Sequence, residues 1–498
     1  MRVRLGQRLE HLELGRVWLV DPWTGREGSA GLVVEAGRIV ELRWARRGLR
    51  QPELLVLPGL TDLHAHLREP GGEDAETVAT ALAAAAHGGF TTVCAMANTT
   101  PPADDPAVIG RVLAAARQSG SPVRVLPYGS ISAGRAGLTL APLGELADAG
   151  AAGFSDDGAP TADPALLGHA LAYAGALGRP VVEHPEDPAL TKGAEMGEGL
   201  TATLLGLRGW PAAGEAGAVA RALAVLADVV RAAPPGATPR LHLTHLSTGG
   251  SVALVRAAKG AHLPVTCDVT PHHLALHDGW VAGDRRFSWD ALAAPWQGGR
   301  TEAPPYDPAT RVNPPLRSPE DALALWAGLV DGTVDAIATD HAPHREVDKR
   351  VEYGTAAAGI SGLETALSLV LAGVEVGLAP LLTVVRALTV GPQRVLARPI
   401  HQPEPGGARR PTVGSGPEVG DDLAVGRSAD LVVVDRASAW TVEPGALRSK
   451  GRNTPLLGRR IGGRVLLTVA GGRVAYLDAS LAEAASPGRP PAARSRTR

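Results

Sequence analysis

The chain has 498 residues and a mass of 51.1 kDa, and its 45% hydrophobic and 20% charged residues are ordinary for a globular protein. It carries 49 Lys and Arg against 51 Asp and Glu, which argues against a nucleic-acid binder or a polybasic membrane-surface protein. Two cysteines, Cys94 and Cys267, exclude a disulfide framework and suit a reducing compartment. Because we find neither a long apolar stretch nor a signal-peptide pattern, we expect a cytoplasmic protein that does not enter a membrane.

Along the chain, apolar β-type runs alternate with alanine-rich helical runs. The expected strands cover residues 55–66, 91–97, 123–129, 152–156, 181–184, 240–246, 265–269 and 334–340. Helix-length segments lie between most of them, at residues 75–87, 106–118, 164–177, 216–232 and 319–329. Eight strands alternating with helices predict an α/β fold with a (β/α)8 TIM-type barrel. A doubly wound open sheet is the alternative.

The two ends of the chain differ from this central part. Short strand-like pieces occur at residues 16–20, 31–34 and 38–42, and again at 429–434, 464–469 and 473–476. We therefore expect a small composite β-sandwich domain built from residues 1–57 and 423–478, flanking the barrel at 58–400. Residues 401–422 are rich in Pro, Gly and charge and are expected to form an insertion or linker. Residues 479–498 are expected to be a disordered tail.

A His-x-His pair is the strongest local indication of chemistry. His64 and His66 lie at the end of the first expected barrel strand, and residues i and i+2 of a strand point to the same face. Two histidines alone are about as often ordinary strand residues as metal ligands. Their place at the C-terminal end of a barrel strand, where barrel active sites lie, favours metal binding.

Further candidate ligands follow later strands. His184 ends the strand at 181–184, His245 lies after residues 240–244, and Asp340 ends the strand at 334–340. Each is weak evidence alone, because a strand-end His or Asp is commonly only a hydrogen-bonding group. Four histidines and an aspartate at the same end of four strands are much less expected by chance.

These residues form part of a longer series of motifs in a fixed order. The series comprises residues 62–71 (DLHAHLREPG), 88–93 (GGFTTV), 98–99 (NT), 154–158 (FSDDG), 312–317 (VNPPLR), 338–344 (ATDHAPH), 359–364 (GISGLE) and 449–455 (SKGRNTP). The series resembles the amidohydrolase superfamily and, within it, bacterial dihydroorotases of the long, type I kind. The resemblance extends over nearly the whole chain and implies the barrel fold expected above.

The resemblance implies a zinc site with one or two ions per chain. One ion would be held by His64, His66 and Asp340, and the other by His184 and His245. Many superfamily members bridge two metals with a carbamylated lysine on strand 4, but the four lysines here are Lys192, Lys259, Lys349 and Lys450. No carbamylated lysine is therefore expected, and the resemblance assigns the bridging role to Asp157. The neighbouring Asp156 is the rival assignment.

The resemblance also implies substrate-binding residues. The expected set is His66, Arg68, Asn98, Asn313, His344 and the backbone at Ala358 and Gly359. Arg68, Asn98 and His344 would read the substrate carboxylate, for which a guanidinium is well suited. Asp340 would be catalytic, moving a proton between the attacking oxygen and the amide nitrogen. His242 is expected to pack, while His272 and His273 are candidates for supporting positions.

The implied activity is dihydroorotase: reversible hydrolysis of cyclic dihydroorotate to N-carbamoyl-L-aspartate, in pyrimidine biosynthesis. One alternative is an allantoinase or hydantoinase-like cyclic amidohydrolase, which usually has the strand-4 lysine. Another is an inactive dihydroorotase-like scaffold of aspartate carbamoyltransferase, but such proteins lose ligands that this chain keeps. The expected partners are a small-molecule substrate and either a second copy of the chain or aspartate carbamoyltransferase.

Departures from the family pattern concern two neighbouring residues and two insertions. Ala97 stands where proline is usual, and Pro185 where cysteine is usual. Extra segments occur at residues 294–310 and within 401–422. The first of them could alter the loop over the site.

Overall fold

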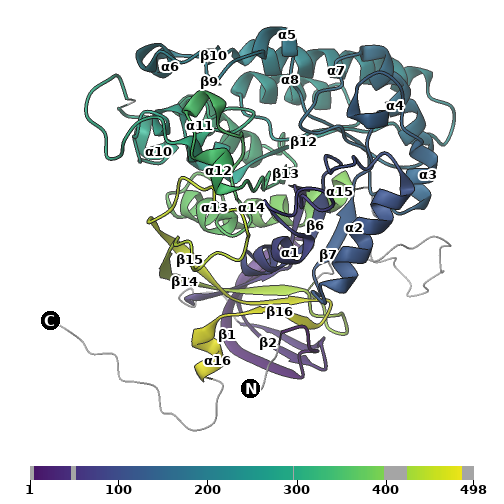
Figure 1. Cartoon of the computed structure of the whole chain (residues 1–498). Coiled ribbons are helices and arrows are strands. Elements are labelled where there is room, and N and C mark those ends of the chain that lie inside the picture. Colours follow the sequence, from purple (N-terminus) through teal and green to yellow (C-terminus); the bar gives the residue numbers. More distant parts are fainter. Residues whose placement is uncertain (1–4, 46–51, 295, 397–422, 485–498) are drawn as a thin grey trace.

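A computed structural model describes residues 5–45, 52–294, 296–396 and 423–484. Strands from the two ends of the chain lie together at one end of the molecule, and the helices gather around the other end (Figure 1). The insertion expected at 401–422 and the tail at 485–498 lie outside the described residues. Within those residues, no helix combines the length and apolar composition needed to cross a membrane.

Both ends of the chain contribute to one seven-stranded sheet, in the order β16-β15-β14-β4-β1-β2-β3. The pairs are antiparallel except for β1 and β4. The strands are β1 (His11–Asp21), β2 (Arg26–Glu35), β3 (Arg38–Trp44), β4 (Leu54–Pro58), β14 (Leu431–Thr441), β15 (Arg460–Ala470) and β16 (Arg473–Leu477). A composite sheet from both termini is thus present, and its description as a two-layered sandwich stays a prediction.

Strand β14 shows how this sheet is attached to the rest of the molecule. Leu431 and Val433 are buried in the sheet's own cluster of apolar side chains. The alternating Val432 and Val434 are buried in the large core of the central part. Because successive strand residues point to opposite faces, one apolar run stabilises both cores.

The central strands are parallel and pair in two groups. The first group, in the order β5-β6-β7, comprises β5 (Leu60–Ala65), β6 (Phe90–Ala95) and β7 (Arg124–Pro127). The second, in the order β13-β12-β11-β8, comprises β8 (Val181–Glu183), β11 (Leu241–Leu243), β12 (Val265–Val269) and β13 (Ala336–Ile337). Single parallel bridges join Gly129 to Phe154, Phe154 to Val181, and His341 to Ala65, so the pairing returns to β5.

Helices connect these strands, and several begin where the sequence predicts. The α-helix at 106–118 starts at Pro106 because Asp105 caps it, accepting a hydrogen bond from the amide of Ala107. Asp163 caps the helix that begins at Pro164 in the same way. The longer helices are α1 (Val78–His87), α2 (Pro106–Gln118), α4 (Pro164–Ala176), α7 (Ala212–Ala232), α8 (Gly249–Gly260), α11 (Pro319–Val330), α13 (Ala366–Glu375) and α14 (Leu381–Leu388).

Shorter elements fill the loops. The short helices are α3 (Leu143–Asp148), α5 (Pro188–Thr191), α6 (Leu200–Leu205), α9 (Pro271–Ala275), α10 (Ser288–Ala291), α12 (Glu346–Lys349), α15 (Val390–Val395) and α16 (Ala479–Ala484). The 3-10 turns are η1 (Ala133–Arg135), η2 (Asp278–Trp280), η3 (Pro308–Thr310) and η4 (Tyr353–Thr355). A small parallel pair is formed by β9 (Met196–Gly197) and β10 (Gly209–Trp210).

The single strand predicted at 55–66 is wrong, because the run divides between two sheets at Gly59. β4 belongs to the seven-stranded sheet, and β5 belongs to the central group. A Cβ at Gly59 would lie 2.0 Å from Asp430 Oδ1 and 2.3 Å from Thr91 Oγ1, so only glycine fits at this junction. The division depends on packing and leaves no break in the apolar pattern.

Two further expectations are corrected by local hydrogen bonds. The predicted strand at 152–156 is reduced to one residue, Phe154, which bridges to Gly129 and to Val181, because Asp156 turns to accept from the amides of Ile131 and Ser132. The disorder expected for 479–498 is wrong for α16, which begins after Asp478. That carboxylate accepts from the amide of Ser480 at 2.9 Å, and Leu481 packs against the sheet's apolar cluster.

Candidate metal and substrate site

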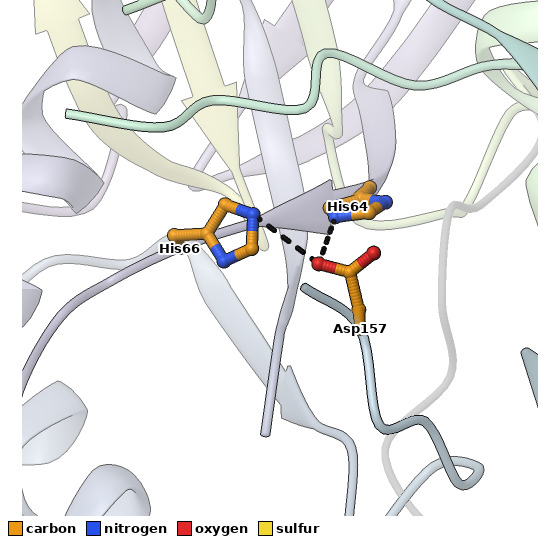
Figure 2. A group of neighbouring side chains, drawn as sticks. All are labelled: His64, His66 and Asp157. Carbon is orange, nitrogen blue, oxygen red and sulfur yellow. Dashed lines mark ion pairs between the residues drawn. The ribbon is translucent and has the colours of Figure 1, made fainter. Parts of the chain in front are cut away.

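Two histidines at the end of β5 face one aspartate from the segment after Phe154 (Figure 2). His64 Nε2 lies 3.1 Å from Asp157 Oδ2, and His66 Nε2 lies 3.4 Å from the same oxygen. All three side chains are buried. The i, i+2 spacing therefore brings both rings to one face, as the sequence predicts.

The other oxygen of Asp157 faces a second pair of histidines. His184 follows β8, and its Nδ1 lies 3.3 Å from Asp157 Oδ1. His245 lies two residues beyond β11, with its Nε2 also 3.3 Å from Oδ1 and 2.9 Å from His184 Nδ1. One carboxylate oxygen of Asp157 thus faces His64 and His66, and the other faces His184 and His245.

Asp340 completes the group around His64 and His66. It lies beyond β13, and its Oδ1 is 3.5 Å from His64 Nε2 and 3.2 Å from His66 Nε2. The backbone of Asp340 has a φ of 44°, a left-handed conformation that is costly for a non-glycine residue. Strain of this kind concentrates at functional sites, which agrees with the position of Asp340 at the centre of this cluster.

The chemistry of these side chains fits divalent metal ions. In two groups, His64, His66 and Asp157 and then Asp157, His184 and His245, one ligand atom per residue lies within 4.8 Å of the others. The buried Nε2 of His64 has no hydrogen-bond partner among the described residues, although two carboxylate oxygens are close. Imidazole nitrogens and carboxylate oxygens are ligands that zinc and related ions prefer.

Charge also concentrates here. Burial by itself raises the pKa of Asp157. The surrounding His64, His184 and His245 lower that pKa by more than burial raises it, so it lies well below its usual range. Burial also raises the pKa of Asp340, but the neighbouring His64 and His66 outweigh it and leave that pKa below its usual range. Both carboxylates are therefore ionised in this environment, as metal ligation requires.

Hydrogen bonds on the far side of the rings fix their orientation. His64 Nδ1 contacts Thr244 Oγ1 at 2.8 Å, and that hydroxyl in turn contacts Asp268. His66 Nδ1 donates to Asn98 Oδ1 at 2.9 Å. These contacts occupy Nδ1 and turn Nε2 of each ring toward Asp157, so Nε2 is the nitrogen that each ring can offer to a metal ion.

Two supporting carboxylates were not predicted. Asp268 accepts from the amide of His245 at 2.6 Å and contacts His242 Nε2 at 2.8 Å, so His242 is hydrogen-bonded behind the site. Glu186 contacts His184 Nε2 at 3.0 Å. Asp268 lies within β12 and Glu186 in a loop, and neither stands in a pattern that marks it in the sequence.

Asp156, the rival of Asp157, points elsewhere. Its carboxylate accepts from the amides of Ile131 and Ser132 and from the Ser132 hydroxyl. Burial raises its pKa, and these hydrogen bonds offset part of that rise. The geometry thus assigns Asp156 to the support of the loop and brings Asp157 to the histidines.

The three residues expected to read a carboxylate lie on neighbouring loops. Arg68 Nη2 lies 3.5 Å from His344 Nε2, and Arg68 Nε donates to the carbonyl of Pro343 at 3.2 Å. His344 Nε2 donates to the carbonyl of Ala358 at 2.8 Å. Burial and the charge of Arg68 lower the pKa of His344 to about 4, so the ring is neutral at neutral pH.

The expected backbone positions at Ala358 and Gly359 lie against His344. Gly359 has a φ of 146°, and a Cβ there would lie 2.7 Å from Ala342 Cβ and 2.9 Å from His344 Nε2. The amide of Gly359 already donates to Arg311, and its carbonyl accepts from Asn453. Asn313, the remaining predicted residue, donates from Nδ2 to Glu186 Oε2 at 3.0 Å.

Described residues of the segment at 294–310 make hydrogen bonds to residues of the short helices α12 and α6. The carbonyl of Pro308 accepts from Lys349 Nζ, which also donates to the carbonyl of Ala357 at 2.7 Å. Tyr306 donates from its hydroxyl to the carbonyl of Leu205. The insertion is therefore linked to the loop that carries Ala358, through one buried lysine.

Comparisons with known proteins identify the family of this chain. A family model described as "Dihydro-orotase-like" matches residues 53–248. Proteins named dihydroorotase from Anaeromyxobacter dehalogenans and Pelotomaculum thermopropionicum are each 43% identical, covering 93% and 92% of this chain and 97% of their own length. The chain belongs to the dihydroorotase family.

Solved structures show the same fold at lower identity. An L-hydantoinase from Arthrobacter aurescens superposes with a TM-score of 0.71, at 23% identity over 93% of this chain and 96% of the other. A dihydropyrimidinase from Brevibacillus agri gives a TM-score of 0.68 at 19% identity, over 94% and 95% of the two chains. This dihydroorotase-family protein therefore shares the mixed α/β fold of these hydantoinase and dihydropyrimidinase structures.

Proposed function

We propose that this protein is a metal-dependent dihydroorotase that interconverts dihydroorotate and N-carbamoyl-L-aspartate in pyrimidine biosynthesis. The observation that carries the proposal is Asp157, whose two oxygens face two separate pairs of histidines. The family relationship supports the substrate. The ring of parallel pairings from β5 back to β5 supports the (β/α)8 barrel that the sequence predicts.

In this proposal, His64, His66 and Asp340 would hold one zinc ion and His184 and His245 would hold a second, with Asp157 facing both groups of histidines. When bound, such ions lower the pKa of water and polarise a carbonyl group. By the family resemblance, Asp157 would serve in place of the lysine that many superfamily members use, and the chain has no lysine before Lys192. The chain's own residues supply orientation, substrate recognition and proton transfer.

Asp340 is the proposed proton carrier. Its carboxylate lies within hydrogen-bond reach of His66 and is ionised, so it can accept a proton from the attacking oxygen and deliver it to the departing ring nitrogen. Because it begins ionised and ends ionised, one carboxylate serves hydrolysis and ring closure alike.

Substrate selection is assigned to Arg68, Asn98 and His344. The Asn98 oxygen accepts from His66, which leaves its amide NH2 to donate to a carboxylate. Arg68 supplies the positive charge, and it lowers the pKa of His344 so that this ring adds no second charge. A plain cyclic ureide without a carboxylate would leave Arg68 unpaired.

A hydantoinase-like activity is the competing assignment. The solved hydantoinases share the fold, but a similarity at 23% identity or below does not identify the substrate of this chain. An inactive scaffold is disfavoured because all six ligand residues converge. A cytoplasmic location and an assembly with a second copy or with aspartate carbamoyltransferase remain predictions.

A comparison of three substrates tests the function. Purified protein should convert dihydroorotate, followed by its ultraviolet absorbance, far faster than allantoin or dihydrouracil. Light scattering with and without aspartate carbamoyltransferase would report the assembly. Preference for allantoin or dihydrouracil would overturn the dihydroorotase assignment.

A further inference from the structure

Glu186 lies between the metal cluster and a predicted substrate-binding residue. It follows β8, two residues after His184, and its side chain is 16% exposed. One oxygen, Oε2, lies 3.0 Å from His184 Nε2 and 3.0 Å from Asn313 Nδ2. The other oxygen accepts from the hydroxyl of Thr191 in α5. A single carboxylate oxygen therefore joins two segments that are 127 residues apart.

The contact with His184 determines which ring nitrogen carries the proton. An ionised carboxylate only accepts hydrogen bonds, so His184 Nε2 must carry the hydrogen that it donates to Glu186. In the neutral ring that metal ligation requires, the lone pair is then on the other nitrogen, Nδ1, which faces Asp157 Oδ1 at 3.3 Å. Glu186 thus holds His184 in the tautomer that a metal ligand needs and increases the basicity of the ligating nitrogen.

The contact with Asn313 determines how its amide is oriented. Because Glu186 accepts, the NH2 group of Asn313 must point toward it, and Oδ1 remains to accept from another group. An amide oxygen in this position would recognise an N–H donor, and the ring of a cyclic ureide carries such a group. Asn313 would then distinguish an N–H from an alkylated or carbonyl position.

We propose that Glu186 is a positioning residue that sets the tautomer of His184 and the amide orientation of Asn313 through one shared oxygen, coupling the metal centre to recognition of a substrate N–H. This inference rests on the proposed function. Its consequence is that loss of Glu186 weakens metal retention and substrate binding together, although Glu186 touches neither the reacting atoms nor the ion.

Two substitutions separate the hydrogen bonds from the charge. Glu186→Ala removes both contacts, so metal affinity should fall by about 10- to 100-fold, and KM for dihydroorotate should rise at saturating zinc. In Glu186→Gln the amide oxygen can replace Oε2 and the NH2 can donate to Thr191, so KM should stay close to the wild-type value. Metal affinity should still fall several-fold, because a neutral amide makes His184 less basic.

The measurements are competition for zinc with a chromophoric chelator and the KM at saturating zinc. Glu145→Ala, an exposed glutamate in α3, is the matched control and should leave both values unchanged. The KM increases of Glu186→Ala and Asn313→Ala should not add in the double variant, because both remove the same contact. Thermal unfolding verifies that each variant folds.

Different results separate this inference from the proposed function. Wild-type protein that binds no zinc, or does not convert dihydroorotate, would contradict the function itself. Wild-type protein that does both, with zinc affinity and KM unchanged in Glu186→Ala, would contradict the positioning role alone. If Glu186→Ala does not fold, a Glu186→Gln variant with wild-type zinc affinity would contradict it in the same way.

Discussion

At the scale of single residues, two adjacent aspartates have different environments. Asp157 faces four histidine rings, whereas Asp156 accepts hydrogen bonds from the loop at Ile131 and Ser132. The sequence predicted an aspartate ligand here because strand 4 has no lysine, and the resemblance favoured Asp157. The side-chain directions that support this choice depend on contacts with residues 131–132, which no local pattern contains.

Asp157→Ala and Asp156→Ala should therefore fail in different ways. Asp157→Ala should lose bound metal and activity, measured by elemental analysis and turnover, while the fold remains. Asp156→Ala should keep its metal, but its free energy of unfolding should fall by about 1–3 kcal/mol because two buried amides lose their acceptor. Metal loss confined to Asp156→Ala would reverse the assignment.

Arg68 should discriminate between charged and uncharged substrates. A charge-assisted hydrogen bond is worth roughly 1.5–3 kcal/mol, so Arg68→Met should lower kcat/KM for dihydroorotate by about 10- to 200-fold. Turnover of uncharged dihydrouracil, where detectable, should hardly change. The variant should also raise the pKa of His344, measured by NMR titration, since a neighbouring charge is removed. Equal losses on both substrates would show that Arg68 supports the metal site instead.

Asp340→Asn tests the proton carrier. The amide keeps the shape of the side chain and an oxygen that can act as a ligand, but it cannot accept and release a proton. We expect kcat to fall by at least ~10²-fold with the metal content retained. A metal-loaded variant with near-wild-type turnover would exclude Asp340 from proton transfer.

At the scale of elements, the helices and strands that could be predicted are those whose boundaries are set by residues close by in the sequence. α2 begins at the predicted residue because Asp105 and Pro106 fix its first turn. It also ends at the predicted residue, Gln118. The boundary at Gly59 was missed because both flanking runs are apolar and only packing against Asp430 and Thr91 separates them. Glu186 could not be predicted either, since its role comes from contact with Asn313, far away in the chain.

The loop between β14 and β15 supplies a further element of the site. Asn453 donates to the carbonyls of Ala342 and Gly359, each at 2.9 Å. Its Oδ1 accepts from the amide of His344 and from the Ser361 hydroxyl, each at 2.9 Å. One buried amide side chain thus joins the loop that carries His344 to the loop that carries Gly359.

Asn453→Ala should loosen these loops and leave the metal cluster intact. We expect KM for dihydroorotate to rise by roughly 10-fold or more, since several hydrogen bonds that position His344 are lost, each worth about 1 kcal/mol. Zinc content should equal that of the wild-type protein. An unchanged KM in a folded variant would show that the loops hold their positions without this contact.

At the scale of the whole molecule, the site depends on the pairing of strands from distant parts of the chain. The candidate metal-binding residues lie between positions 64 and 340. They meet because Phe154 bridges the two groups of parallel strands on one side, and His341 pairs with Ala65 on the other. The sheet formed by both termini packs on this ring through Val432 and Val434. The alternating pattern predicted the parallel strands of this central part, and the ligand roles that the motifs imply stay predictions. The proposed limits of the domains remain a prediction, because segments 46–51 and 397–422 lie outside the described residues.

The central claim is that a metal centre arranged around Asp157 performs dihydroorotate chemistry. The most direct measurement is the rate of dihydroorotate hydrolysis by chelator-treated protein as zinc is returned in known equivalents. The account predicts that activity is lost on chelation and returns in full by no more than two equivalents per chain, with no recovery in Asp157→Ala. Metal-free protein that remains fully active, or an Asp157→Ala variant that recovers like the wild type, would contradict it.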